Sequence, residues 1–127
     1  MLSHSALIHI KKIPKKGYGV FASCLIPERT VIERVPVLVV PTSSMWLPDG
    51  VSPFAKYTFA WGKQTVGLAL GYGSLYNHSY NPNARYDDAR GQIKVFTAIC
   101  EITEGTEITI NYNGDPDDPK DVGFAVI

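Results

Sequence analysis

The sequence lacks any run of apolar residues long enough to cross a membrane. Its longest such run, residues 35–40, contains a proline and is far shorter than the roughly 20 residues that a spanning helix needs. A signal-peptide pattern is also missing, because the first ten residues mix polar with apolar side chains and the lysines come after them. These absences predict an intracellular protein without a membrane partner.

Cysteine is scarce, and the net charge is zero. The two cysteines, Cys24 and Cys100, lie far apart without nearby ligand partners, which disfavours a disulfide framework or a zinc site and predicts free thiols. Twelve acidic and twelve basic residues balance, so no overall field recruits nucleic acid. Four lysines nevertheless lie near the start and four aspartates near the end: Lys11, Lys12, Lys15, Lys16, Asp115, Asp117, Asp118 and Asp121. Solvated surface patches are the simpler interpretation, and capture of a basic peptide by the acidic set is the alternative.

A helical hydrophobic period is missing as well, since no window of ten or more residues keeps one. Short alternating or apolar stretches recur instead, with Gly or Pro between them, which predicts one mostly β domain of small sheets. The predicted strands cover residues 7–13, 20–22, 30–34, 37–40, 57–61, 65–70, 84–88, 92–98 and 107–112. Residues 42–53 are predicted to form a loop with at most one helical turn. Within this loop, Met45, Trp46 and Leu47 are predicted to anchor in the core.

The most distinctive stretch covers residues 70–86. Two glycines end an apolar strand there, and Asn77-His78-Ser79 and Asn81-Pro82-Asn83 then place six polar or turn-forming residues close together. Such a concentration of side-chain donors and acceptors predicts a ligand-binding segment. A weaker signal is Gly17-Tyr18-Gly19, which permits a close approach of the backbone to a ligand, although a plain hairpin turn is the simpler interpretation of this segment alone.

Three motifs, in this order, resemble those of the SET-domain protein-lysine methyltransferases, especially the minimal kind found in viruses and bacteria. They are an N-terminal glycine turn at 16–21, an asparagine-histidine-serine motif at 75–79 followed by Pro82-Asn83, and a closing glutamate-to-tyrosine strand at 105–112. The resemblance implies a single SET domain over residues 1–127, with several small curved sheets, little helix and a C-terminal pseudoknot that brings the second and third motifs together. It also implies S-adenosylmethionine as cofactor and a protein substrate with an exposed lysine, a histone tail being one candidate.

The residue types suit methyl transfer from a sulfonium to a lysine amine, which requires no metal. The nucleophile must be neutral, and with a lysine pKa of about 10.4 this form costs about 4 to 5 kcal/mol at neutral pH. An aromatic channel disfavours the ammonium form, and a tyrosine hydroxyl can orient the amine. By resemblance, Tyr112 and Tyr86 are predicted to be catalytic, and Tyr57, Tyr86 and Ile110 to line the lysine channel. A packed strand tyrosine is the alternative for Tyr112, and a core or edge aromatic is the alternative for Tyr57.

The resemblance also assigns residues to the cofactor. They are Lys16, Gly17 and Tyr18 at its methionine part, Asn77 and His78 at its adenine and amino ends, and Phe124 stacked on the adenine. A general-base role for His78 is less favoured, because no carboxylate follows at a spacing that would orient the ring. Ile110 stands where many members have phenylalanine or tyrosine, which leaves the number of transferred methyl groups open.

The sequence after the third motif departs from the pattern of many chromatin enzymes. Their cysteine-rich zinc segment is missing, so residues 114–127 are predicted to complete the site, and a contribution from a second subunit in a homodimer is left open. A non-catalytic SET-fold module that binds the cofactor or a basic peptide is the alternative function.

Overall fold

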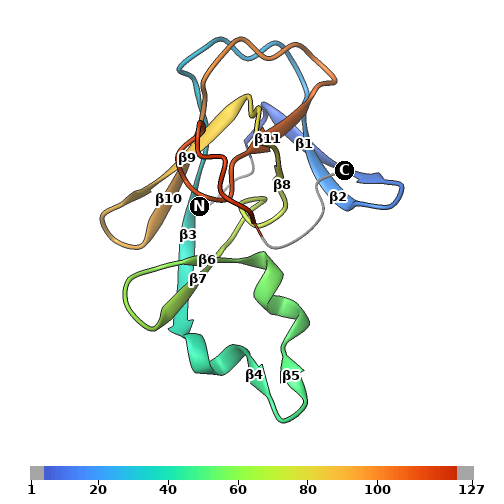
Figure 1. The fold of residues 1–127 in the computed structure, drawn as a ribbon. Helices are drawn as coiled ribbons and strands as arrows, with labels where there is room; N and C mark the ends of the chain where they lie inside the picture. The colour runs from blue at the N-terminus through green and yellow to red at the C-terminus, as the bar shows by residue number, and fades with distance from the viewer. Residues whose placement is uncertain (1–4, 123–127) are drawn as a thin grey trace.

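The computed structural model describes residues 5–122, which form short strands joined by turns (Figure 1). The strands are β1 Ile8–Ile13, β2 Gly17–Ala22, β3 Val31–Pro41, β4 Trp46–Leu47, β5 Gly50–Val51, β6 Thr58–Ala60, β7 Thr65–Ala69, β8 Asn77–His78, β9 Ala84–Ala89, β10 Ile93–Ala98 and β11 Glu107–Ile110. Within the described residues, the helical segments are two 3-10 turns, η1 Thr42–Met45 and η2 Pro53–Tyr57. None of these segments is long and apolar enough to span a membrane. The predicted mostly β fold with little helix is confirmed.

The strands form three sheets. A four-stranded sheet has the order β1-β2-β11-β8, a five-stranded sheet has the order β6-β7-β3-β10-β9, and β4 pairs only with β5. Two predicted hairpins, β6-β7 and β9-β10, are present with antiparallel pairing. Most of the strand pattern was therefore readable from the alternation of side chains.

The two apolar stretches on either side of Pro36 form one long strand, β3, rather than two. Pro36 is tolerated because β3 changes partner there: the residues before it pair with β10, and those after it pair with β7. Its carbonyl oxygen still accepts a hydrogen bond from the Leu70 N–H at 3.0 Å. Because a proline lacks only the backbone donor, a position between two ladders accommodates it.

The prediction that Trp46 and Leu47 anchor in the core is wrong. Their side chains are 70% and 47% exposed, and Met45 is only partly buried. Trp46 and Leu47 form β4, whose pairing with β5 was not predicted, and this hairpin lies at the end of the molecule farthest from β1 and β2 (Figure 1). Among residues 5–122, β4 and β5 pair only with each other, and the apolar side chains of Trp46, Leu47 and Val51 are exposed.

A single hydrophobic cluster joins the two larger sheets. Its fully buried members come from strands of both, including Val20 and Ile108 from the first and Phe96 from the second. The rings of Tyr76 and Phe96 stack with centroids 4.3 Å apart. The Tyr76 hydroxyl donates to Oε1 of the buried Glu33 at 2.7 Å, and burial followed by the Glu33 charge raises the pKa of Tyr76 well above its usual value. This packing fixes the segment that leads into β8.

The C-terminal strand β11 is inserted between segments formed earlier in the chain. It pairs antiparallel with β2 and parallel with β8. Asn83, in the turn before β9, holds β11 through its side chain: Nδ2 donates to the Glu107 carbonyl oxygen and Oδ1 accepts from the Thr109 N–H, each at 2.9 Å. The second and third motifs meet in this way, as the resemblance implied.

Replacing Asn83 with alanine should destabilise the protein by about 1 to 3 kcal/mol, because one backbone donor and one backbone acceptor of β11 lose their partner. Urea denaturation followed by circular dichroism measures the change. Asn81→Ala is the matched control, since Asn81 lies exposed in the same turn and its replacement should cost no more than about 0.5 kcal/mol. Equal effects of the two variants would contradict the proposed role of Asn83.

Candidate active site

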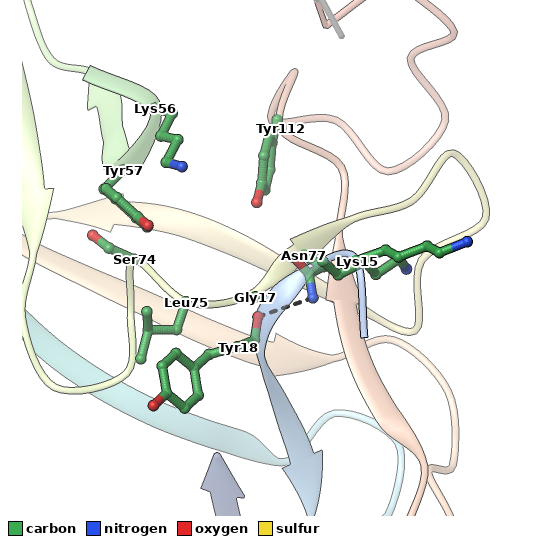
Figure 2. Close-up of a pocket in the computed structure, with 10 residues that line it drawn as sticks. Lys15, Gly17, Tyr18, Lys56, Tyr57, Ser74, Leu75, Asn77 and Tyr112 are labelled. Carbon is green, nitrogen blue, oxygen red and sulfur yellow. Dashed lines mark hydrogen bonds between the residues drawn. The ribbon is translucent and has the colours of Figure 1, made fainter. Parts of the chain in front are cut away.

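A pocket lies where the β1-β2 turn, η2, the segment before β8 and the end of β11 come together. Its volume is about 670 Å³, within the usual range for small-molecule sites. Figure 2 shows the Tyr57 and Tyr112 side chains reaching toward it from opposite sides. The pocket is lined by Lys15, Lys16, Gly17, Tyr18, Lys56, Tyr57, Ser74, Leu75, Asn77 and Tyr112.

A narrow recess of about 100 Å³ adjoins this pocket, because the two share four lining residues: Lys56, Tyr57, Ser74 and Tyr112. The recess is further lined by Thr58, Phe59, Ala60 and Tyr76. Four of its eight lining residues are aromatic, and Lys56, Thr58 and Ser74 are polar. One wide compartment and one slender compartment meet at Tyr57 and Tyr112.

Three of the predicted cofactor residues come from the first motif and line the pocket. Gly17 has a φ of +85°, a conformation that glycine adopts readily, and it opens β2 after the turn. Gly19 permits the close approach of this strand to the rest of the site. A Cβ added at Gly19 would lie 2.6 Å from Ile13 Cδ1 and 2.7 Å from Glu107 Oε2. Lys16 and Tyr18 flank the turn on the pocket side.

Asn77 and Glu107 connect the three motifs. Asn77 Nδ2 donates to the Tyr18 carbonyl oxygen at 3.2 Å, drawn in Figure 2, and to Glu107 Oε2 at 2.7 Å. Glu107 Oε1 also lies 4.0 Å from Lys16 Nζ. Glu107 was not among the predicted site residues, although its place at the start of the closing strand was visible in the sequence.

His78 is buried beside the pocket rather than in its lining. Its Nδ1 accepts a hydrogen bond from the Tyr112 N–H at 3.0 Å, and the two rings lie 5.2 Å apart. Burial lowers the pKa of His78 from its ordinary value of 6.5, so the imidazole is neutral at physiological pH. Within this structure, His78 holds the backbone of Tyr112. Its predicted contact with a cofactor stays a prediction.

Tyr112 follows β11 and lines both compartments. Its hydroxyl donates to the Tyr76 carbonyl oxygen at 2.5 Å. Burial, then the nearby Glu107 and Tyr57, raise the pKa of Tyr112 to about 12. Tyr112 is thus a neutral phenol with a fixed direction, suited to orient a neighbouring group and unsuited to remove a proton at neutral pH.

The other predicted channel residues lie at different depths. Tyr57, at the end of η2, is 38% exposed and lines both compartments. Tyr86 lines neither: its hydroxyl donates to the Tyr112 carbonyl oxygen at 3.0 Å, and burial followed by Asp88 raises the pKa of Tyr86 to about 12. Ile110 is fully buried in the core and also lines neither compartment. Phe124 lies outside the described residues.

Six of the eight residues that line the recess were not predicted from the sequence, Phe59 and Ser74 among them. Phe59 forms part of its wall, and its ring lies 4.9 Å from that of Tyr86 and 6.5 Å from that of Tyr112. Ser74 lines both compartments. The alternation of Tyr57, Phe59 and Trp61 predicted one strand over residues 57–61. Only Thr58–Ala60 form β6, and the alternation did not show what Phe59 covers.

Comparison with known proteins agrees with this arrangement of strands and motifs. Residues 17–113 match the family model of the SET domain, and the chain belongs to the SET-domain family. It is 35% identical over 107 residues to the histone-lysine N-methyltransferase, H3 lysine-37 specific, of Schizosaccharomyces pombe. That match covers 83% of this chain and 72% of the relative.

Two further similarities extend the comparison. Histone-lysine N-methyltransferase SETD7 of Halocynthia roretzi is 27% identical over 123 residues, which cover 84% of this chain and 31% of that protein. The chain therefore spans about a third of the length of that relative. A crystal structure of a Plasmodium falciparum protein described as a candidate histone methyltransferase superimposes with a TM-score of 0.66 at 28% identity. It covers 87% of this chain and 95% of its own.

Acidification should weaken the link between His78 and Tyr112. The unfolded His78 binds a proton near pH 6.5 and the folded one only at lower pH, so stability falls as the pH drops below 6.5. Thermal unfolding from about pH 8 to about pH 5 measures this trend. His78→Asn keeps an acceptor but does not titrate, so its melting temperature should fall less steeply than that of the wild type. Parallel curves would contradict the assignment.

Proposed function

We propose that this chain is an S-adenosylmethionine-dependent protein-lysine N-methyltransferase. The observation that carries the proposal is the pair of joined compartments, with Tyr57 and Tyr112 at their junction. The wide compartment suits a cofactor of nucleoside size, and the slender aromatic recess suits the aliphatic stem of a lysine. Membership of the SET-domain family and the names of its relatives support the same activity. They do not favour a non-catalytic module.

The donors and acceptors of the wide compartment fit the amino-acid end of the cofactor. Lys15 and Lys16 offer ammonium groups to a carboxylate. Asn77 already uses its amide nitrogen as donor to Tyr18 and Glu107, so the atom that it offers to a ligand is its carbonyl oxygen. That oxygen can accept a hydrogen bond from the ammonium group of the ligand.

When bound, the cofactor would supply a methyl group on a sulfonium, which the lone pair of a neutral substrate amine would accept. The product ammonium then returns one proton to water. The rings of Tyr57, Phe59 and Tyr112 line the recess and would exclude water from a substrate lysine, and this desolvation favours the neutral amine. Tyr112 itself stays protonated, so it orients the amine without acting as its base.

The segment after β11 is proposed to complete the single domain. Asn111 Nδ2 donates to the Asp118 carbonyl oxygen and Asn113 Nδ2 donates to the Lys120 carbonyl oxygen, each at 2.7 Å, so residues 114–120 are folded back onto the closing strand. The exposed Asp115 and Asp117 lie on this segment. We propose a basic protein segment as the substrate, with a histone tail as the first candidate, because the relatives are named for histone lysines. Action inside the cell follows from such a substrate, and a homodimer stays a prediction.

Isothermal titration calorimetry with S-adenosylmethionine should detect binding to the wild type. Asn77→Ala should bind about tenfold or more weakly, because the acceptor in the pocket and the link to Glu107 are both lost. Asn81→Ala, in the exposed turn, serves as the control with unchanged affinity. A wild type that does not bind refutes the cofactor assignment, and equal affinity of Asn77→Ala means that the pocket has been misplaced.

Tyr112→Phe should lower the single-turnover rate of methyl transfer by about 100-fold, because the ring remains while the hydroxyl that fixes its direction is removed. Radiolabelled S-adenosylmethionine with candidate proteins, histones among them, measures the rate, and mass spectrometry locates the labelled lysine. Tyr80→Phe removes a hydroxyl that donates to Lys120 outside the pocket and should leave the rate unchanged. An unaltered rate in Tyr112→Phe would show the catalytic assignment to be wrong.

A further inference from the structure

A buried lysine lies on the far side of the recess wall. Lys94, in β10, is 0% exposed and stands opposite Asp88 in the β9-β10 hairpin. Its Nζ donates to Asp88 Oδ1 at 2.6 Å, and the Asp88 side chain is 45% exposed. A lysine is almost never fully buried without a partner, because the charged form loses its hydration. The partly exposed Asp88 carboxylate contacts the Lys94 ammonium group on one side only.

Aromatic rings surround Lys94 on its other sides. Its Nζ lies 4.1 Å from the ring centroid of Phe59, 4.2 Å from that of Tyr86 and 5.4 Å from that of Trp61. All three distances are within the roughly 6 Å over which a cation is attracted to a ring face. Burial lowers the pKa of Lys94, whereas Asp88 and Asp87 act in the opposite direction. The three rings and the Asp88 carboxylate form a cage, the Lys94 cage, around one cation.

Two rings of the Lys94 cage also support the reacting site. Phe59 forms part of the recess wall and packs near the Tyr112 ring, with centroids 6.5 Å apart. Tyr86 donates its hydroxyl to the Tyr112 carbonyl oxygen. Lys94 itself lines neither compartment. Lys94 therefore contacts Phe59 and Tyr86, the two residues that support Tyr112. It does not contact the space where a substrate would lie.

We propose that Lys94 is a positioning residue for methyl transfer, whose ammonium holds Phe59 and Tyr86 in place and through them fixes Tyr112 and the recess wall. The inference rests on the proposed function. Ring faces carry partial negative charge, so a cation close to both rings attracts each of them. A neutral side chain of similar length would fill the same volume without that attraction. The positive charge, rather than bulk alone, is what the site requires.

Lys94→Met tests this requirement, because methionine keeps most of the stem and removes the charge. Its kcat for methylation should fall by about tenfold to 100-fold, as expected for a displaced catalytic group, while calorimetry gives an affinity for S-adenosylmethionine within about twofold of wild type. Lys94→Arg retains a cation and should keep kcat within about fivefold of wild type. Trp61→Leu removes the most distant ring of the Lys94 cage. Because Trp61 is not one of the two residues that support Tyr112, this variant should lower kcat less than Lys94→Met.

A spectroscopic measurement reports on the Lys94 cage without requiring activity. The chain has two tryptophans, and Trp46 is 70% exposed, so Trp46→Phe leaves Trp61 as the single reporter within the cage. In this background Lys94→Met should change the emission maximum of Trp61, and Lys94→Arg should change it less. Unchanged emission in both would contradict the cage.

The outcomes separate this inference from the proposed function. If the wild type methylates no protein, the proposed function fails while the emission test still decides on the cage. If the wild type is active and folded Lys94→Met keeps its kcat within about twofold, the positioning role is overturned. Should Lys94→Met not fold, Lys94→Arg decides: retention of kcat supports the role of the charge, and a loss of tenfold or more means that the shape of lysine, not its charge, is needed.

Discussion

The candidate site depends on one constraint, the insertion of β11 between β2 and β8. Strand pairing brings the third motif beside both of the others, and the Asn83 side chain bonds to two backbone groups of β11. Glu107 then links Lys16 to Asn77 across the same junction. Without this insertion Tyr112 would lose two hydrogen bonds, the one that its hydroxyl donates to the Tyr76 carbonyl oxygen and the one that its N–H donates to His78 Nδ1. The strand order therefore brings the residues of the candidate site together, and no single motif contains all of them.

Much of this fold could be predicted because its strands are short, alternating and bounded by turn residues. The two long hairpins followed directly from that alternation. The hairpin of β4 and β5 did not, because apolar residues at 46–51 indicate burial only if something covers them, and sequence alternation does not specify the covering element. The prediction of two strands around Pro36 was wrong for a related reason. A proline can lie within one strand where that strand changes partner, and this depends on the strand order.

The candidate site could be predicted from the sequence to about the same extent as the fold. The four residues Lys16, Tyr18, Asn77 and Tyr112 could be named because they belong to motifs with recognisable residue types at fixed spacings. The structure places them around one pocket, and their contact with a ligand stays a prediction. The supporting residues are ordinary by type. Nothing in the sequence distinguishes Glu107 or Lys94 from other strand residues, and only the packing of β10 against β6 and β9 gives Lys94 its environment. Tertiary contacts of this kind cannot be recognised from the neighbouring residues in the sequence.

Desolvation sets the protonation states around the recess in one consistent direction. It is the largest cause of the raised pKa values of Tyr76, Tyr86 and Tyr112, and of the lowered pKa values of His78 and Lys94. Each shift favours the neutral form. Lys94 is the case in which a carboxylate 2.6 Å away opposes the desolvation and supports the ammonium form that the Lys94 cage requires. A substrate lysine entering the recess on the other side of Phe59 would also lose hydration, without the Asp88 carboxylate that opposes the shift at Lys94. Burial of the substrate amine would shift its pKa in the same direction, toward the neutral form that methyl transfer requires.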